Sequence, residues 1–514
     1  MTLTGKRLYL VVAACAVVVY LGALKNRFAF DDLAIVLWNS LFTKPGAWWR
    51  AFASSYWPPE MGGGMYRPLT VFTYALDWWV ARASWFHAMN LLWHAGASVG
   101  VAALARRWAG DRAALAAGLI FAVHPVHVEA VANIAGRAEL MAALFAILAV
   151  YAALACDQVG WSALAAALAL LCKENGAVVP ALIVWGWIMG LARPPRRRIA
   201  AYVASWIAVG AAYAIVRWYV LRPYAGVFNI AAQFLGASPF EIRLTAVAAF
   251  ADFARLLVLP IHLRVDYSPA ERTLVTSPLD GRFLLGALCL AVWATLLVLA
   301  WRRGRKLEAF GLGWIALALL PVANLLYPAG VLVAERTLYL PSVGLALAAG
   351  IALARLGEMP ERAGEPAAPQ PVWLVVLAFI TIAGGVRSFL RVPVWRDELT
   401  VVLSEFEDSP RSFDGPSRMV GIYLSQHKPE KAFEAFSIAE RIYNQLPWLY
   451  MAGADVAFNL RRSGLADSML ARLEQLCGHC EFYYRFEATA ARARGDSAVA
   501  DSLLARLARL PQRP

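Results

Sequence analysis

Charged residues are scarce in this chain. Asp, Glu, Lys and Arg make up only 16% of its 514 residues, whereas 60% of the residues are hydrophobic. A soluble globular domain carries more charge than this, so the composition excludes an ordinary soluble protein. It predicts a protein that crosses the membrane several times and is integral to it.

Cysteine is rare as well, with six residues in all, and four of them lie inside apolar runs where burial makes a thiol inert. The other two, Cys477 and Cys480, form a CxxC pair without a second pair of ligands, which argues against a zinc site. If this region lies outside the cell membrane, the pair predicts a disulfide.

The net charge of +13 does not indicate nucleic-acid binding, because the basic residues occur in short clusters between apolar runs. Such clusters are typical of cytoplasmic loops. The strongest cluster, at residues 193–198, therefore marks a cytoplasmic side, and nucleic acid is not expected as a partner.

The apolar runs predict about eleven membrane spans, with the N-terminus in the cytoplasm and the C-terminus outside. The first run has no convincing cleavage site and is expected to be a retained anchor. Residues 25–86 form the first external loop, and the run at 244–259 is expected to be an in-plane or re-entrant helix. The predicted spans are residues 8–24, 87–105, 113–123, 141–156, 161–172, 177–191, 199–220, 283–301, 310–320, 338–354 and 372–389.

Beyond residue 391 the charge rises and a repeat appears. Residues 466–473 nearly match residues 500–507, and residues 432–436 provide a third copy at the same offset of 34. That period is typical of tetratricopeptide helical hairpins. The sequence therefore predicts an all-α chain, with a membrane domain at 1–390 and an extracytoplasmic, tetratricopeptide-like α-solenoid at 391–514.

Two adjacent acids, Asp31 and Asp32, follow the first apolar run. In one interpretation Asp31 caps a helix at residues 33–38 and Asp32 lies in its first turn. In the other the pair is functional, because acids beside lipid are costly to place. A divalent cation held by these two carboxylates is a further alternative, and no cofactor is certain.

On the predicted topology the conspicuous polar residues of the apolar part lie mainly on the external side. Arginine binds phosphate as a fork, and a carboxylate accepts a proton from a hydroxyl, so this set suits transfer from a phosphate leaving group. The structural alternatives are backbone hydrogen bonds for the histidines, mutual pairing at helical spacing, and a lysine reaching out from a helix end. The set includes Asp31, Asp32, Arg67, His124, His127, Glu129, Arg137, Glu139, Lys173, Glu174, Glu335 and Arg336.

Six short stretches occur in the order known from one enzyme family. They are residues 30–36, 66–70, 124–131, 136–140, 173–174 and 334–342. They resemble the motifs of the transmembrane-and-tetratricopeptide-repeat O-mannosyltransferases and their bacterial relatives. The resemblance implies a C-type glycosyltransferase fold in the membrane domain and a bacterial cytoplasmic membrane as its location.

The same resemblance implies an inverting transfer of mannose or another hexose from a polyprenyl-phosphate donor on the external face. Asp31 or Asp32 would be the catalytic base, and Arg336, Arg67 and Arg137 would bind the donor phosphate. The supporting residues of the substrate site would be His124, His127, Glu129, Glu139, Lys173, Glu174 and Glu335.

Several alternatives stay open at this point. The acceptor is either a protein or an envelope glycolipid or polysaccharide, and the repeats could recruit a protein partner. The chain could instead be a transporter or flippase of lipid-linked sugars, since buried charges in many spans suit translocation. A third alternative is a membrane scaffold without catalytic activity.

Overall fold

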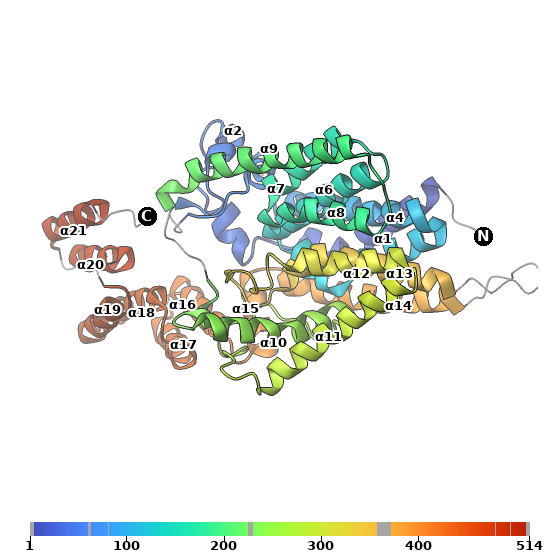
Figure 1. Ribbon diagram of the computed structural model, residues 1–514. Coiled ribbons are helices and arrows are strands. Elements are labelled where there is room, and N and C mark those ends of the chain that lie inside the picture. Colours follow the sequence, from blue (N-terminus) through green and yellow to red (C-terminus); the bar gives the residue numbers. More distant parts are fainter. Residues whose placement is uncertain are drawn as a thin grey trace, which may run out of the picture. The chain divides into compact units, whose positions relative to one another are not determined.

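The structure, a computed structural model, describes residues 5–59, 63–80, 82–224, 230–356, 372–478, 480–493 and 495–509 (Figure 1). The regular elements in these ranges are all helices, which confirms the predicted all-α class. The chain divides into two compact units. The first contains Met1–Leu221, Ala237–Leu263 and Val275–Glu398, and the second contains Arg222–Gly236, Arg264–Leu274 and Leu399–Pro514.

The first unit is built from long apolar helices. By length and composition, seven helical segments among the described residues could cross a membrane, so the chain is an integral membrane protein. The longer helices of this unit are α1 (Lys6–Tyr20), α3 (Pro68–Trp78), α4 (Ala83–Ala122), α6 (Arg137–Leu154), α7 (Val159–Cys172), α8 (Val179–Ile188), α9 (Arg196–Leu221), α10 (Pro239–Val258), α11 (Gly281–Arg302), α12 (Lys306–Leu319), α13 (Tyr339–Leu356) and α14 (Val372–Arg391).

Each of the eleven predicted apolar segments lies mainly within a helix, but two of them share one. The segments at 87–105 and 113–123 both belong to α4, which is interrupted only at Gly110, where φ is 76°. A left-handed φ suits glycine and lets the chain turn between two helical stretches. The helices α7, α8 and α12 are shorter than the seven candidate spans, and the run predicted to lie in plane is α10.

Close helix packing brings distant motifs together. A Cβ on Gly344 of α13 would lie 2.3 Å from the backbone oxygen of Gly311 in α12, so both positions require glycine. The helix α13 also packs against α4. As a result the short helix η10 (Glu335–Leu338), just before α13, contacts α5 (Val128–Ala132).

The segment predicted to form the first external loop has a packed core of its own. It contains η2 (Leu33–Leu37), α2 (Ala47–Arg50), η3 (Ala51–Ala53) and α3. Buried side chains of this segment, among them Val36, Phe42 and Tyr74, pack with Phe86 of α4 and with Ile134. The loop is therefore fixed against the helices beside it, which holds its acidic pair in a defined place.

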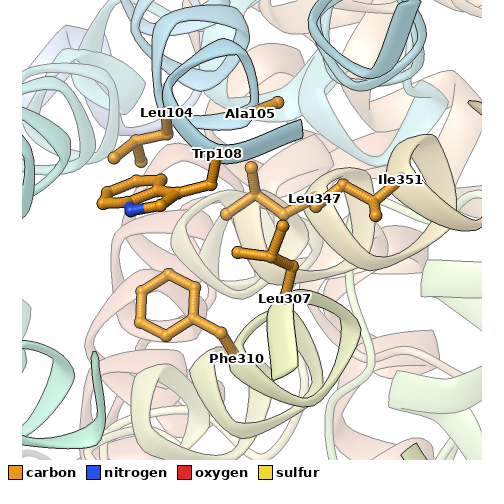
Figure 2. A pocket seen from close by; sticks show the side chains of 7 residues that line it. All are labelled: Leu104, Ala105, Trp108, Leu307, Phe310, Leu347 and Ile351. Atoms are coloured by element: carbon orange, nitrogen blue, oxygen red, sulfur yellow. The ribbon is translucent and has the colours of Figure 1, made fainter. Parts of the chain in front are cut away.

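A small hollow between α4, α12 and α13 is lined entirely by apolar side chains (Figure 2). Its lining includes Trp108 of α4, Phe310 of α12 and Leu347 of α13. Because the lining offers no ionisable or hydrogen-bonding group apart from the indole of Trp108, this hollow provides no set of catalytic residues.

The second unit is a series of helices: α15 (Glu398–Asp408), α16 (Asp414–Ser425), α17 (Pro429–Ile442), α18 (Pro447–Asn459), α19 (Ser463–Cys477), α20 (Glu481–Ala493) and α21 (Ser497–Arg509). The helices α17, α19 and α21 begin at residues 429, 463 and 497, which are 34 residues apart each time. This is the spacing that the sequence repeat predicts. Cys477 and Cys480 form a disulfide, which confirms that prediction.

Candidate active site

The residue just before the two acids of the first loop has a left-handed backbone conformation. Phe30 has φ 58°, and its N–H donates to Oε2 of Glu398 over 2.6 Å. A bulky residue in this region costs about 1–3 kcal/mol and persists where surrounding contacts impose it. The turn leads directly into Asp31 and Asp32, whose side chains have different partners.

Asp32 is an internal anchor, with only 1% of its surface exposed. Its Oδ1 accepts from the N–H of Ala135 at 2.6 Å, and its Oδ2 accepts from Ile134 at 3.2 Å and from Ala29 at 3.4 Å. Burial raises the pKa of Asp32 to about 8, while these N–H donors oppose the shift. Asp32 thus fastens the first loop to the turn before α6.

The capping interpretation of the acid pair is wrong. Residues 33–37 form a π-helix, and the side chain of Asp32 at its N-cap makes no capping hydrogen bond. The side chain of Asp31 pairs with Arg336 instead. Distant partners have replaced local capping for both acids.

Asp31, Arg336 and Glu129 form one charged triad. Nη2 of Arg336 lies 3.4 Å from Oδ2 of Asp31, and Nη1 of the same guanidinium contacts Oε1 of Glu129. Glu129 is buried, whereas the side chains of Asp31 and Arg336 are 17% and 24% exposed. Three separate motifs of the sequence therefore meet at one accessible guanidinium.

Two further ion pairs belong to the same set of predicted residues. Arg67 bonds to Oε2 of Glu174 at 2.9 Å, and its guanidinium lies 4.6 Å above the ring of Tyr56. Lys173 pairs with Glu139.

Lys173 lies close enough to two other cations, Arg67 and Arg336, to interact with them electrostatically. Burial lowers the pKa of Lys173; the charge of Glu139 opposes this, and the charges of Arg67 and Arg336 lower the pKa further. Each of the three cations thus has its own carboxylate, and Lys173 also feels the charges of both arginines. An anion entering this region would meet positive charge from three parts of the chain.

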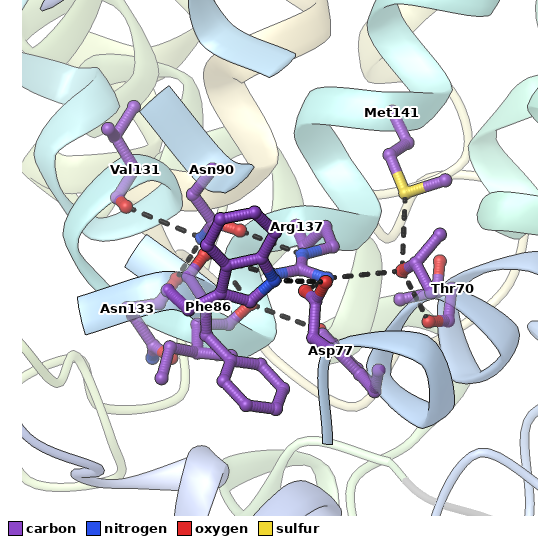
Figure 3. Close-up of polar contacts among 12 residues, drawn as sticks. Thr70, Asp77, Phe86, Asn90, Val131, Asn133, Arg137 and Met141 are labelled. Atoms are coloured by element: carbon purple, nitrogen blue, oxygen red, sulfur yellow. Dashed lines mark hydrogen bonds and ion pairs between the residues drawn. The ribbon is translucent and has the colours of Figure 1, made fainter. Parts of the chain in front are cut away.

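Arg137, another predicted phosphate ligand, is completely buried and occupied by protein groups (Figure 3). It pairs with Asp77 of α3 and donates to Oδ1 of Asn90 and to the backbone oxygen of Phe86, both at 2.9 Å. A weaker bond of 3.3 Å goes to Thr73. These bonds tie α6 to α3 and α4, so the structure gives Arg137 the surroundings of a structural residue.

The two histidines lie in the core rather than beside Asp31. His124 contacts the backbone oxygen of Leu257 through Nε2 at 2.9 Å, and Nε2 of His127 lies 2.7 Å from Oγ of Ser342. The ring of His127 also packs 4.5 Å from that of Tyr339. Glu335 precedes Arg336 in η10 and is buried.

The turn that carries the anchor of Asp32 requires a glycine. A Cβ added to Gly136 would lie 2.2 Å from the backbone oxygen of Ala130. We expect Gly136→Ala to lower the free energy of unfolding by about 1–3 kcal/mol, because backbone atoms must move to admit the methyl group. Thermal unfolding of the purified variant measures this, and an unchanged midpoint would contradict the tight approach.

Sequence analysis missed three side chains that hold the site. Asp77 and Asn90 bind Arg137, and Tyr56 lies under Arg67 and donates to the backbone oxygen of Ala135 at 3.3 Å. The sequence did offer a signal for Asp77, because an acid within an apolar helix such as α3 is a candidate for a specific partner. Nothing in the sequence around Tyr56 indicated its contact with Arg67.

The two acids of the pair differ in what they could offer a divalent cation. Both oxygens of Asp32 accept backbone N–H groups, and Asp31 faces the guanidinium of Arg336 through Oδ2. The part of the chain that the structure describes contains no group of three His, Cys, Asp or Glu side chains placed to hold a metal.

Known proteins are similar to this chain over much of its length. Protein O-mannosyl-transferase F38B6.6 of Caenorhabditis elegans is 26% identical over 420 residues, which cover 79% of this chain and 58% of the relative. Protein O-mannosyl-transferase TMTC4 of Homo sapiens is 27% identical over 457 residues, covering 76% and 60%. These similarities confirm the resemblance found in the motifs, and this chain spans at most three fifths of these two relatives.

A shorter alignment and a solved structure complete the comparison. Protein O-mannosyl-transferase Tmtc2 of Drosophila melanogaster is 35% identical over 189 residues, covering 33% of this chain and 20% of the relative. The apo oligosaccharyltransferase of Archaeoglobus fulgidus aligns with 96% of this chain and 72% of its own, with 13% identity and a TM-score of 0.42. No protein-family profile matches the chain.

Proposed function

We propose that the chain is a membrane glycosyltransferase that moves a hexose from a polyprenyl phosphate to a protein hydroxyl. The observation that carries this proposal is the triad of Asp31, Arg336 and Glu129, which puts an accessible carboxylate beside an accessible guanidinium. The relatives are named O-mannosyl-transferases of proteins, which favours a protein acceptor over a glycolipid and mannose as the sugar.

In this proposal Asp31 is the catalytic base. It is the more exposed of the two acids, and its partner is a guanidinium rather than a set of backbone N–H groups. Asp32 orients the loop through Ile134 and Ala135. A base must reach the proton it removes, which a fully enclosed carboxylate cannot do.

The proposed transfer accounts for every bond, proton and electron pair with the donor, the acceptor and residues of this chain. The acceptor oxygen attacks C1 of the sugar as Asp31 takes its proton, and the bond from C1 to the phosphate oxygen breaks. The electron pair leaves on that oxygen, and Arg336 stabilises the charge as polyprenyl phosphate departs. Attack from the side opposite the phosphate inverts the anomeric centre.

The remaining cations have different proposed roles. Arg67 and Lys173 add positive potential near Arg336, each moderated by its own carboxylate. Arg137 is structural because protein groups occupy it fully. The positions of the basic loops lead us to propose that the N-terminus lies in the cytoplasm and the repeats lie outside. The membrane we propose is a bacterial cytoplasmic membrane, as the motif resemblance implies.

Proteoliposomes that contain the full chain test the donor class. They are given a labelled hexose as a polyprenyl monophosphate, a polyprenyl diphosphate or a nucleotide sugar, together with a serine- and threonine-rich peptide. We expect label in the peptide from the monophosphate alone. Transfer from the nucleotide sugar would contradict the proposal, and movement of the intact lipid-linked sugar across the bilayer without transfer would support a flippase.

A further inference from the structure

Glu129 holds Arg336 at two points. Its Oε2 accepts from the backbone N–H of Arg336 at 2.8 Å, and its Oε1 contacts Nη1 of the guanidinium. One carboxylate thus fixes both the start of the residue and the end of its side chain. An arginine side chain has many rotamers, and this arrangement selects one of them.

The support beneath Glu129 is rigid. It lies on α5, and every residue of that helix is buried. Gly136 packs tightly against Ala130 of the same helix, and Asp32 fastens the adjoining turn. A carboxylate on such a support does not follow the guanidinium if Arg336 moves.

The two acids of the triad hold Arg336 differently. Glu129 makes two contacts and retains 1% side-chain exposure, whereas Asp31 makes a single contact of 3.4 Å and retains 17%. A buried, doubly bonded partner is harder to displace than a partly exposed one at a longer distance. An incoming anion would therefore replace Asp31 at Nη2 and leave Glu129 in place.

We propose that Glu129 is a positioning residue for donor binding. It holds Arg336 in place while Nη2 releases Asp31 and binds the donor phosphate instead. This inference rests on the proposed function of the site. When the donor binds, Asp31 loses its cationic partner and becomes available to the acceptor hydroxyl. The phosphate thereby couples donor occupancy to release of the base.

The proposal predicts that only one of the two acids strengthens donor binding. Equilibrium binding of a labelled polyprenyl-phosphate hexose is measured on proteoliposomes of the full chain, without acceptor. We expect Glu129→Gln to raise the Kd about 10- to 100-fold, the effect of losing a charge-assisted contact. We expect Asp31→Asn to lower the Kd or leave it unchanged, because a competitor of the phosphate is removed.

Glu308→Gln is the matched control. Glu308 is a buried acid that pairs with Arg355 at 2.8 Å between α12 and α13, and it has no part in the proposed site. We expect this variant to bind donor like the wild type. The double variant with Glu129→Gln and Arg336→Lys should bind about as weakly as Arg336→Lys alone, since both changes remove the same positioned guanidinium.

The outcomes separate the inference from the proposed function. Wild-type protein that binds no lipid-linked monophosphate sugar overturns both. Wild-type binding with an unchanged Kd in Glu129→Gln, or additive effects in the double variant, overturns the inference alone. If Glu129→Gln does not fold, Glu129→Asp is used, because its shorter side chain cannot reach both contacts; the same rise in Kd is expected, and an unchanged Kd overturns the inference.

Discussion

Replacing Asp31 with asparagine is expected to slow sugar transfer by about 10²–10⁴-fold, the usual contribution of a general base. The substitution keeps the size of the side chain and removes only its ability to take a proton. Because the side chain of Asp31 is partly exposed and its ion pair is with the likewise accessible Arg336, the fold should be unaffected. The measurement is the rate of label transfer at saturating donor, with equal amounts of protein in the membrane.

Asp32→Asn is the comparison that identifies the base. An asparagine at this site would turn an NH₂ group toward the N–H of either Ala135 or Ile134. An unsatisfied buried donor costs about 1–3 kcal/mol, so this variant should unfold at a lower temperature. A folded Asp32→Asn enzyme without activity, beside an active Asp31→Asn enzyme, would assign the base to Asp32.

Replacing Arg137 with methionine is expected to lower the free energy of unfolding by about 3–5 kcal/mol. The change leaves the carboxylate of Asp77 buried without its cation and also removes the donors to Asn90 and Phe86. Such a loss is a large fraction of the free energy of unfolding of a typical protein, about 5–15 kcal/mol. The protein retained in the membrane and its midpoint of thermal unfolding in detergent both report it.

A second variant distinguishes this structural role from phosphate binding. Combining Arg137→Met with Asp77→Leu removes both charges, and we expect it to recover part of the lost stability because no isolated charge remains. If Arg137→Met folds normally and instead fails to bind the donor, Arg137 is a phosphate ligand, as the resemblance implies.

The sequence was sufficient to predict the helical elements. Apolar runs and the 34-residue repeat are local signals, and the structure has helices at each of them. The motifs also predicted that Asp31 and Arg336 would share one site, although 305 positions separate them along the chain. Their meeting depends on the contact between η10 and α5, for which the sequence carries no local signal.

The partners of individual charges could not be predicted in the same way. Arg137 looked like a phosphate ligand because its motif gave no sign of Asp77 on another helix. The acids of the first loop suggested a helix cap, since local spacing cannot reveal that Asp32 reaches Ala135. Such contacts arise from tertiary packing, which overrides local preference wherever a distant donor is closer than a neighbouring one.

The stereochemistry of the product tests the central claim most directly. The wild-type chain in proteoliposomes transfers a hexose of known anomeric configuration from polyprenyl phosphate to a peptide, and NMR determines the configuration of the new bond. Direct attack by a hydroxyl that Asp31 deprotonates predicts complete inversion. Retention of configuration would require an intermediate on the enzyme and would contradict the proposed displacement at the triad of Asp31, Arg336 and Glu129.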